Sequence, residues 1–210
     1  MTEDADPRRL AVLVSGTGRT LANLIEKIES GALTARVALV GADRAGIRGL
    51  ELASERGIPT VVVRPRDCAN SDEFSARLFE SIEAAGCGTL VLAGFLRFLP
   101  ISDRWAGRVI NIHPSLLPAH GGKGCYGDRV HAAVLAAGDA ETGCTVHYVD
   151  NVYDHGPAIL QVRVPVEPDD EVGTLAARVF AAECRALTEA LRLHLEGQVR
   201  VEDGRLLRRP

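Results

Sequence analysis

Short apolar runs alternate with stretches of helical periodicity along the first half of the chain, and this alternation constrains the fold more than any other feature. A continuous apolar run fits a strand buried on both faces, whereas apolar residues at every third or fourth position fit an amphipathic helix. The expected strands are residues 10–14, 36–41, 57–63, 89–93 and 109–113, and the expected helices are residues 21–28, 46–56 and 71–85. Strands that alternate with helices of this length indicate an α/β fold with a doubly wound, mainly parallel sheet.

The pattern changes in the second half of the chain. Residues 145–149 and 158–166 alternate apolar and polar side chains, which is typical of antiparallel strands with one face toward solvent. The remaining expected elements are helices at residues 128–137 and 171–195 and a hairpin at residues 199–207, turned by Asp203-Gly204. We therefore expect antiparallel strands added to the sheet in the C-terminal half.

Length and composition limit the class of protein. A chain of 210 residues with 46% apolar and 25% charged residues suits one globular domain, residues 1–210, or at most two. A net charge of −4 argues against binding nucleic acid through a basic surface. No apolar run approaches the roughly 18 residues of a membrane span, and the start of the chain lacks the pattern of a signal peptide.

Cysteine usage points to the cytoplasm. The five cysteines are scattered without a Cys-x-x-Cys pair, which indicates free thiols in a reducing compartment and gives no zinc spacing. We expect a cytoplasmic protein with no membrane or nucleic-acid partner. The sequence leaves monomer and homodimer equally open.

An Asn-x-His pair marks the end of the fifth expected strand. Because side chains alternate along a strand, Asn111 and His113 would emerge on one face, and Pro114 would end the strand there. Ligands bind at this carboxyl edge in open α/β sheets, where an amide and an imidazole can stabilise an oxyanion and move protons. An isolated pair of this kind more often caps a turn, so the neighbouring motifs decide between the two interpretations.

A glycine-rich turn follows the first expected strand. The residues S-G-T-G-R-T lie between a strand and a helix, where backbone amides and the positive helix end make an anion site. Their spacing fits neither a dinucleotide nor a P-loop motif, so a single phosphate is expected. A tight turn that needs glycine explains the motif equally well, and Arg19 favours the phosphate.

At this point the chain resembles the folate-dependent formyltransferases, in particular those that act on 5′-phosphoribosylglycinamide. The resemblance runs from Leu10 to the C-terminal hairpin and depends on the segments S-G-T-G, G-F-L-R-F-L, N-I-H-P-S-L-L-P, G-C-T-V-H-Y-V-D and Y-D-H-G-P-A-I-L-Q. It implies a Rossmann-like formyltransferase fold with a phosphate-binding half at residues 8–112 and a folate-binding, catalytic half at residues 113–210. It also implies 10-formyltetrahydrofolate as co-substrate, no metal, and a place in purine synthesis.

The resemblance assigns roles to individual residues. Asn111 would be the amide donor, His113 the oxyanion-stabilising imidazole, and Asp154 the carboxylate that orients or charges His113 and relays protons. An Asx turn alone would also explain Asp154. The remaining assignments are the phosphate and ribose of the acceptor on Ser15, Gly16, Thr17, Gly18, Arg19, Thr20 and Glu183, and folate on Phe95, Leu96, Arg97, Phe98, Leu99, Val152 and Tyr153. A solvated helix face explains Glu183 equally well.

The chain departs from the family pattern around the substrate residues. Arg19-Thr20 replace a common Ser-Asn, the loop at residues 119–127 is longer, and His155 stands where glycine is usual. These changes leave formyl transfer intact and bear on the choice of acceptor. Among the other histidines, His131 and His194 are expected on helix surfaces. His147 fits either a core imidazole or a partner of the site.

Four other functions compete with this interpretation. Formyltransferases for amino sugars or aminoacylated tRNA usually carry a further C-terminal domain, and tRNA binding would want a basic face. The hydrolase of formyltetrahydrofolate resembles this chain but carries an extra N-terminal domain. A binding protein without catalysis would be favoured only if Asn111, His113 or Asp154 were missing, and all three are present.

Overall fold

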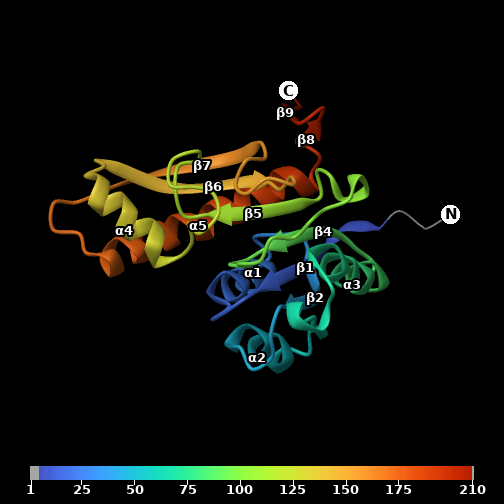
Figure 1. Ribbon diagram of the computed structural model, residues 1–210. Helices are drawn as coiled ribbons and strands as arrows, with labels where there is room; N and C mark the ends of the chain where they lie inside the picture. Colours follow the sequence, from blue (N-terminus) through green and yellow to red (C-terminus); the bar gives the residue numbers. More distant parts are fainter. Residues whose placement is uncertain (1–4, 210) are drawn as a thin grey trace. The chain divides into compact units, whose positions relative to one another are not determined.

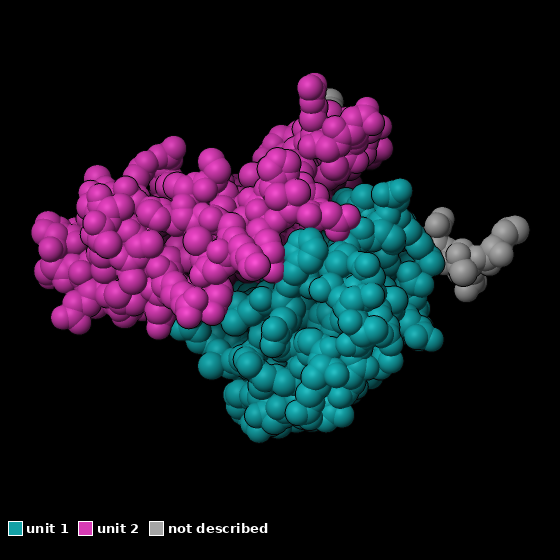
Figure 2. Space-filling view, in the orientation of Figure 1, with its two compact units in different colours: residues 1–110 teal, residues 111–210 magenta. Residues whose placement is uncertain are grey.

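The computed structural model describes residues 5–209 and divides the chain into two compact units, unit 1 up to Ile110 and unit 2 from Asn111 (Figure 2). This boundary falls close to the one expected between the two functional halves. The number of folding domains stays a prediction.

Unit 1 contains a parallel arrangement of four strands (Figure 1). The strands are β1 (Asp6–Val14), β2 (Arg36–Ala42), β3 (Thr60–Val62) and β4 (Cys87–Leu92), in the order β3-β2-β1-β4. The central strand β1 is fully buried from Leu10 to Val14, as a strand with neighbours on both sides and helices around it requires. Its carboxyl end opens into the glycine-rich turn.

Three helices pack against these strands. They are α1 (Arg19–Glu29), α2 (Arg48–Glu55) and α3 (Ser71–Ala84), with short 3₁₀ turns at Pro65–Asp67 and Asp103–Trp105. Helix α3 begins where its sequence provides a cap, because the Asn70 side chain accepts a hydrogen bond from the Glu73 backbone N–H. Helix α1 begins without such a side-chain cap, a difference that matters for anion binding.

Unit 2 is built on antiparallel strands and one long helix. Strand β5 (Val109–His113) starts at the end of unit 1 and finishes in unit 2, beside β6 (Glu141–Tyr148) and β7 (Ala158–Pro165), which pair antiparallel. Helix α4 (Asp128–Ala137) packs against α5 (Val172–Leu195), and α5 packs against β6 and β7 (Figure 1). Strands β8 (Val199–Glu202) and β9 (Arg205–Arg208) form the expected hairpin.

The expected α/β class with a mainly parallel sheet is confirmed, and the differences have local causes. Strand β1 begins at Asp6 rather than Leu10, since residues with polar side chains can still pair through their backbone. Strand β6 begins at Glu141 rather than Thr145, and Gly143 interrupts its alternation. A Cβ on Gly143 would lie 1.9 Å from the Val162 backbone oxygen, so only glycine fits there.

The expectation that His131 lies on a helix surface is wrong. His131 is buried on α4 together with Val130 and Val134. Three neighbouring positions of this helix therefore face inward, and the buried stripe is wider than the apolar pattern alone indicates. His194 is half-buried rather than on an open surface, since its Nδ1 lies 2.9 Å from the Tyr148 hydroxyl.

Candidate active site

Strand β5 contains Asn111 and His113 at its carboxyl end, as the sequence predicts. Ile112 between them is buried with the core, so the two polar side chains share the opposite face. The strand ends at His113 because Pro114 follows and cannot continue the ladder. His113 is only 4% exposed, while Asn111 is half-buried.

The His113 ring has a defined orientation. Its Nε2 lies 3.0 Å from the backbone oxygen of His120. A carbonyl oxygen can only accept, so Nε2 carries a hydrogen and donates it. The other ring nitrogen, Nδ1, faces Asp154 Oδ2 at 3.6 Å. The side of the imidazole that can exchange a proton is therefore the side that faces the carboxylate.

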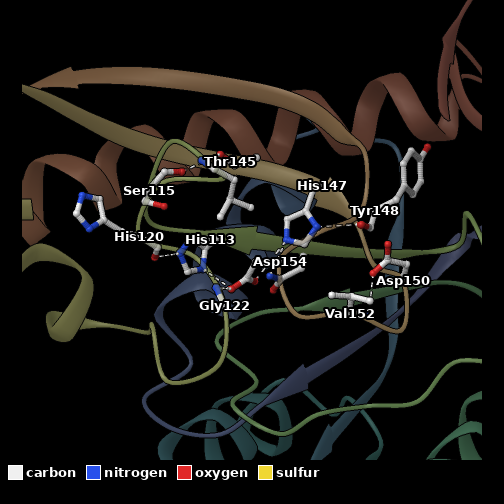
Figure 3. A network of polar contacts seen from close by, with 12 residues as sticks. His113, Ser115, His120, Gly122, Thr145, His147, Tyr148, Asp150, Val152 and Asp154 are labelled. Atoms are coloured by element: carbon white, nitrogen blue, oxygen red, sulfur yellow. Dashed lines mark hydrogen bonds and ion pairs between the residues drawn. The ribbon is translucent and has the colours of Figure 1, made fainter. Parts of the chain in front are cut away.

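Asp154 lies in the loop between β6 and β7, in a backbone conformation with φ of 52° that side chains rarely adopt. The Gly122 N–H donates a hydrogen bond of 2.8 Å to its Oδ2, and His147 Nε2 lies 3.8 Å from its Oδ1. Figure 3 shows the carboxylate between the two imidazoles. The three residues expected to be catalytic thus form one cluster within unit 2.

His147 fixes the orientation of the Asn111 amide. Its Nδ1 donates to the Tyr148 backbone oxygen at 2.9 Å, which leaves Nε2 to accept from Asn111 Nδ2 at 3.0 Å. Burial lowers the pKa of His147, against the opposing hydrogen bond to Tyr148 and the nearby Asp154, so the ring is neutral at pH 7. An amide nitrogen has two hydrogens, so Asn111 keeps one for a ligand oxygen. The sequence left the role of His147 open; the structure makes it a positioning residue.

Side-chain hydrogen bonds hold the turn after His113 against β6. The Ser115 hydroxyl donates to Ala119 O at 2.5 Å, and the Thr145 hydroxyl donates to Ser115 O at 2.7 Å. The Leu117 N–H in turn donates to the Thr145 hydroxyl oxygen at 3.0 Å. The buried Ser115 and Thr145 therefore fix the backbone that leads from His113 to the loop above Asp154.

The glycine-rich turn of unit 1 is shaped by backbone contacts. Ser15 is buried, and its hydroxyl oxygen accepts from the Leu96 N–H at 3.1 Å. Gly18 has φ of 72°, and a Cβ there would lie 2.7 Å from the Gly49 Cα. Helix α1 starts directly after Gly18, with no side-chain cap and no acidic residue in its first turn. This positive helix end suits an anion. Arg19, expected in the turn, is the first residue of the helix.

The residues expected to bind folate divide by exposure. Phe95 and Leu99 are buried in unit 1, where Phe95 stacks on Phe74 with 6.3 Å between ring centroids. Leu96 and Arg97 are exposed, and Arg97 Nε donates to the buried Asp43 at 3.0 Å. In unit 2, Val152 and Tyr153 are exposed. The half-buried Phe98 and the exposed members of the set are the side chains a ligand can reach.

Glu183 lies on α5 and is half-buried rather than fully solvated. Burial raises the pKa of the Cys144 thiol to about 12, and the nearby Glu183 carboxylate adds to the rise.

Among residues 5–209, no helix combines the length and the apolar character that a membrane crossing requires. The same part of the chain has no group of three histidine, cysteine or acidic side chains arranged to hold a metal ion.

Comparison with known proteins assigns the family. The profile of the formyl transferase family matches residues 8–191, which include the cluster of unit 2 and the glycine-rich turn of unit 1. The chain belongs to the formyl transferase family. This membership confirms the family resemblance drawn from the sequence.

Three individual proteins show how similar this chain is to members of the family. A phosphoribosylglycinamide formyltransferase of Haemophilus influenzae is 32% identical and aligns over 94% of this chain and 92% of that protein. A trifunctional purine biosynthetic protein of Drosophila melanogaster is 40% identical over 90% of this chain, which spans only 14% of that relative's length. Glycinamide ribonucleotide transformylase 1 of Symbiobacterium toebii has the same fold, with a TM-score of 0.88, 36% identity and coverage of 96% and 94%.

Proposed function

We propose that this formyl transferase moves the formyl group of 10-formyltetrahydrofolate to the amine of 5′-phosphoribosylglycinamide, giving the N-formyl amide and tetrahydrofolate for purine synthesis. The observation that carries the proposal is the cluster of Asn111, His113 and Asp154. Asp154 faces the rings of His113 and His147 at 3.6 and 3.8 Å, and His147 accepts a hydrogen bond from Asn111. The names of the Haemophilus influenzae relative and the Symbiobacterium toebii structure support this choice of acceptor.

The cluster meets the electrostatic need of the reaction. When the amine nitrogen bonds to the formyl carbon, the C=O bond opens and its oxygen becomes an oxyanion. The second N–H of Asn111 can donate to that oxygen, because His147 holds the amide with its nitrogen toward the site. Nδ1 of His113 becomes a second donor once it has taken up, through Asp154, the proton that the amine gives up, and Nε2 stays bound to the His120 carbonyl.

In the proposed reaction, Asp154 accepts and transfers protons. The attacking amine must lose a proton, and the folate nitrogen must gain one as its bond to the formyl carbon breaks. The Asp154 carboxylate, directly or through water, takes the proton from the amine, and His113 or the same water returns one to the leaving nitrogen. Gly122 occupies one lone pair of Oδ2 and leaves the rest of the carboxylate for this transfer.

The substrate-binding assignments follow the family pattern. The phosphate of the acceptor belongs on residues Ser15 to Thr20, where α1 begins without a side-chain cap and its positive end favours an anion. Ribose hydroxyls belong on Glu183, and the pterin on residues 95–99 and 152–153. The assignment to Phe95 and Leu99 is limited to their backbone, because their side chains are buried.

The proposal assigns the enzyme to the cytoplasm as a monomer or homodimer that works on small molecules, without metal, nucleic acid or membrane. All five cysteines are free thiols, which suits a reducing compartment.

Acceptor-dependent turnover tests this function. The protein is mixed with a 10-formyl-folate donor, and the deformylated folate is followed spectrophotometrically with and without 5′-phosphoribosylglycinamide. The proposal predicts turnover only with the acceptor, together with the N-formyl product. The Asp154→Asn variant controls for a contaminating activity, since a contaminant would give the same rate in both preparations.

Hydrolysis of formyl-folate is the second candidate. A formyltetrahydrofolate deformylase of Pseudomonas syringae has a TM-score of 0.82 and 26% identity, and it covers 96% of this chain, which spans only 66% of that protein. The same cluster would serve water in place of the amine. Turnover without acceptor in the assay above would establish hydrolysis and overturn transfer.

A further inference from the structure

His120 has an unusual conformation in the loop that follows the catalytic strand. It is one of three residues other than glycine within positions 5–209 that have a positive φ, here 52°. Its side chain is bound, because Nε2 lies 2.6 Å from Asp139 Oδ2. Its backbone oxygen accepts the hydrogen bond from His113 Nε2. His120 therefore connects Asp139 to the catalytic imidazole.

Asp139 provides a fixed end for this connection. It follows α4 directly, after the helix has ended at Gly138, and its N–H donates to Val134 O at 3.4 Å. Helix α4 packs on α5 through its buried face, so the position of Asp139 is set by the packing of two helices. The His120 and Asp139 side chains are 21% and 39% exposed, so the pair is partly shielded from solvent.

The loop at residues 120–122 contacts both catalytic groups. His120 offers its carbonyl to His113, and Gly122 offers its N–H to Asp154. These contacts have opposite chemical requirements: a carbonyl selects a protonated ring nitrogen, and an N–H selects an ionised or accepting oxygen. Together they orient the His113 ring so that Nδ1, and not Nε2, faces Asp154.

We propose that the His120–Asp139 pair is a positioning pair that fixes the tautomer and ring orientation of His113 through the His120 carbonyl. A histidine in the left-handed region is strained, and the bond to Asp139 holds it there. Without the pair, the loop relaxes, the carbonyl leaves Nε2, and either ring nitrogen of His113 can carry the hydrogen. Neither residue touches the reacting atoms.

The first test is spectroscopic and is independent of the reaction catalysed. Long-range ¹H–¹⁵N NMR of the histidine rings, with His113 assigned from its missing signals in His113→Gln, reports which nitrogen carries the hydrogen. We expect the Nε2–H form in the wild type and a mixture of tautomers in His120→Ala and in Asp139→Ala. His120→Gly should restore the Nε2–H form in part, because glycine adopts the positive φ without strain.

The second test is kinetic, and its interpretation as formyl transfer depends on the proposed function. In His120→Ala and Asp139→Ala we expect kcat to fall about tenfold, with KM for both substrates changed less than about twofold. Glu141→Gln, which removes an acidic group of β6 from an exposed ion pair with Arg163 of β7, is the matched control and should leave both constants unchanged.

The two tests separate the possible failures. An unchanged His113 tautomer and unchanged kcat in both alanine variants would overturn the positioning role. A wild-type protein without acceptor-dependent turnover would refute the proposed function, while a tautomer shift in the variants would still support the connection to His113. If His120→Ala fails to fold, Asp139→Ala decides, since it leaves the loop residues unchanged.

Discussion

The proposed catalytic cluster of unit 2 and the glycine-rich turn of unit 1 both lie at carboxyl ends of strands, but they are built differently. The cluster consists of side chains, and each functional group of Asn111, His113 and Asp154 has a specific hydrogen-bond partner or charged neighbour. The turn consists of backbone, and its shape depends on Gly18 lying against Gly49.

Because of this difference, the two regions should respond to different kinds of mutation. A change of one functional group at constant size should damage the cluster and spare the turn. A single added carbon should damage the turn, while conservative polar changes there should matter little. The two regions should also affect different constants, since we propose that the cluster acts in the transition state and that the turn acts in binding.

The largest effect is expected from Asp154→Asn. The amide keeps the size of the side chain but removes the proton acceptor, so kcat should fall by roughly 10²–10⁴-fold, the range for loss of a general acid–base group. Folate affinity, measured by fluorescence titration, should stay within about twofold. A large loss of folate affinity with kcat preserved would show that Asp154 binds rather than catalyses.

Gly18→Val tests the turn in the opposite way. The new Cβ would meet backbone at 2.7 Å and sit at φ of 72°, so the free energy of unfolding should fall by about 2–4 kcal/mol. Urea denaturation measures this loss, and KM for the phosphorylated acceptor should rise about tenfold with folate binding retained. Gly31→Val, also at positive φ but with open space around it, is the steric control. If the free energy of unfolding falls equally in the two variants, the packing of Gly18 on Gly49 has no special role.

Arg19→Ala, also at the glycine-rich turn of unit 1, should have a smaller effect. Arg19 begins α1 and is exposed, so it would add one charge to the proposed anion site, which consists mainly of backbone amides. We expect KM for the phosphorylated acceptor to rise about three- to tenfold, with KM for folate and kcat unchanged. Steady-state kinetics at several salt concentrations measure this change. An unchanged KM would show that Arg19 is directed elsewhere.

The smallest effect is the contribution of His147 in the cluster to the dependence of stability on pH. The pKa of His147 is lowered by burial from its ordinary value of 6.5, so below about pH 6.5 the unfolded chain binds more protons at this residue. The free energy of unfolding should therefore fall as the pH falls from 6.5 toward 5. His147→Gln should have a shallower slope over this range in denaturation curves. Identical slopes would contradict a buried neutral ring.

The two regions also differ in how much of each the sequence predicts. Residue types single out the Asn111 and His113 pair, because an amide and an imidazole carry recognisable chemistry, and the family resemblance adds Asp154. The structure brings these three residues into one cluster, and their catalytic roles stay a proposal. Pro114 marked the end of β5 because it lacks the N–H that a strand needs. The elements themselves followed from periodicity, and most boundaries were within a few residues.

The contacts that orient the cluster cannot be predicted from the sequence, for physical reasons. The Gly122 N–H and the His120 carbonyl are backbone groups. Every residue has the carbonyl and every residue but proline has the N–H, so no residue type signals their use. The bond from His147 to Asn111 joins neighbouring strands, and its partner depends on a register that periodicity does not supply. The Gly143 position in β6 and the burial of His131 likewise depend on tertiary packing.

The most direct test of the account is the rate of a single turnover in Asn111→Ala. Enzyme in excess over 10-formyl-folate, with the acceptor saturating, is followed by rapid mixing, and both substrate affinities are measured separately by titration. The account predicts a rate constant for formyl transfer at least about 100-fold below that of the wild type, with affinities within about twofold, because an oxyanion donor acts only in the transition state. A rate constant close to the wild-type value would contradict the assignment of the chemistry to this cluster.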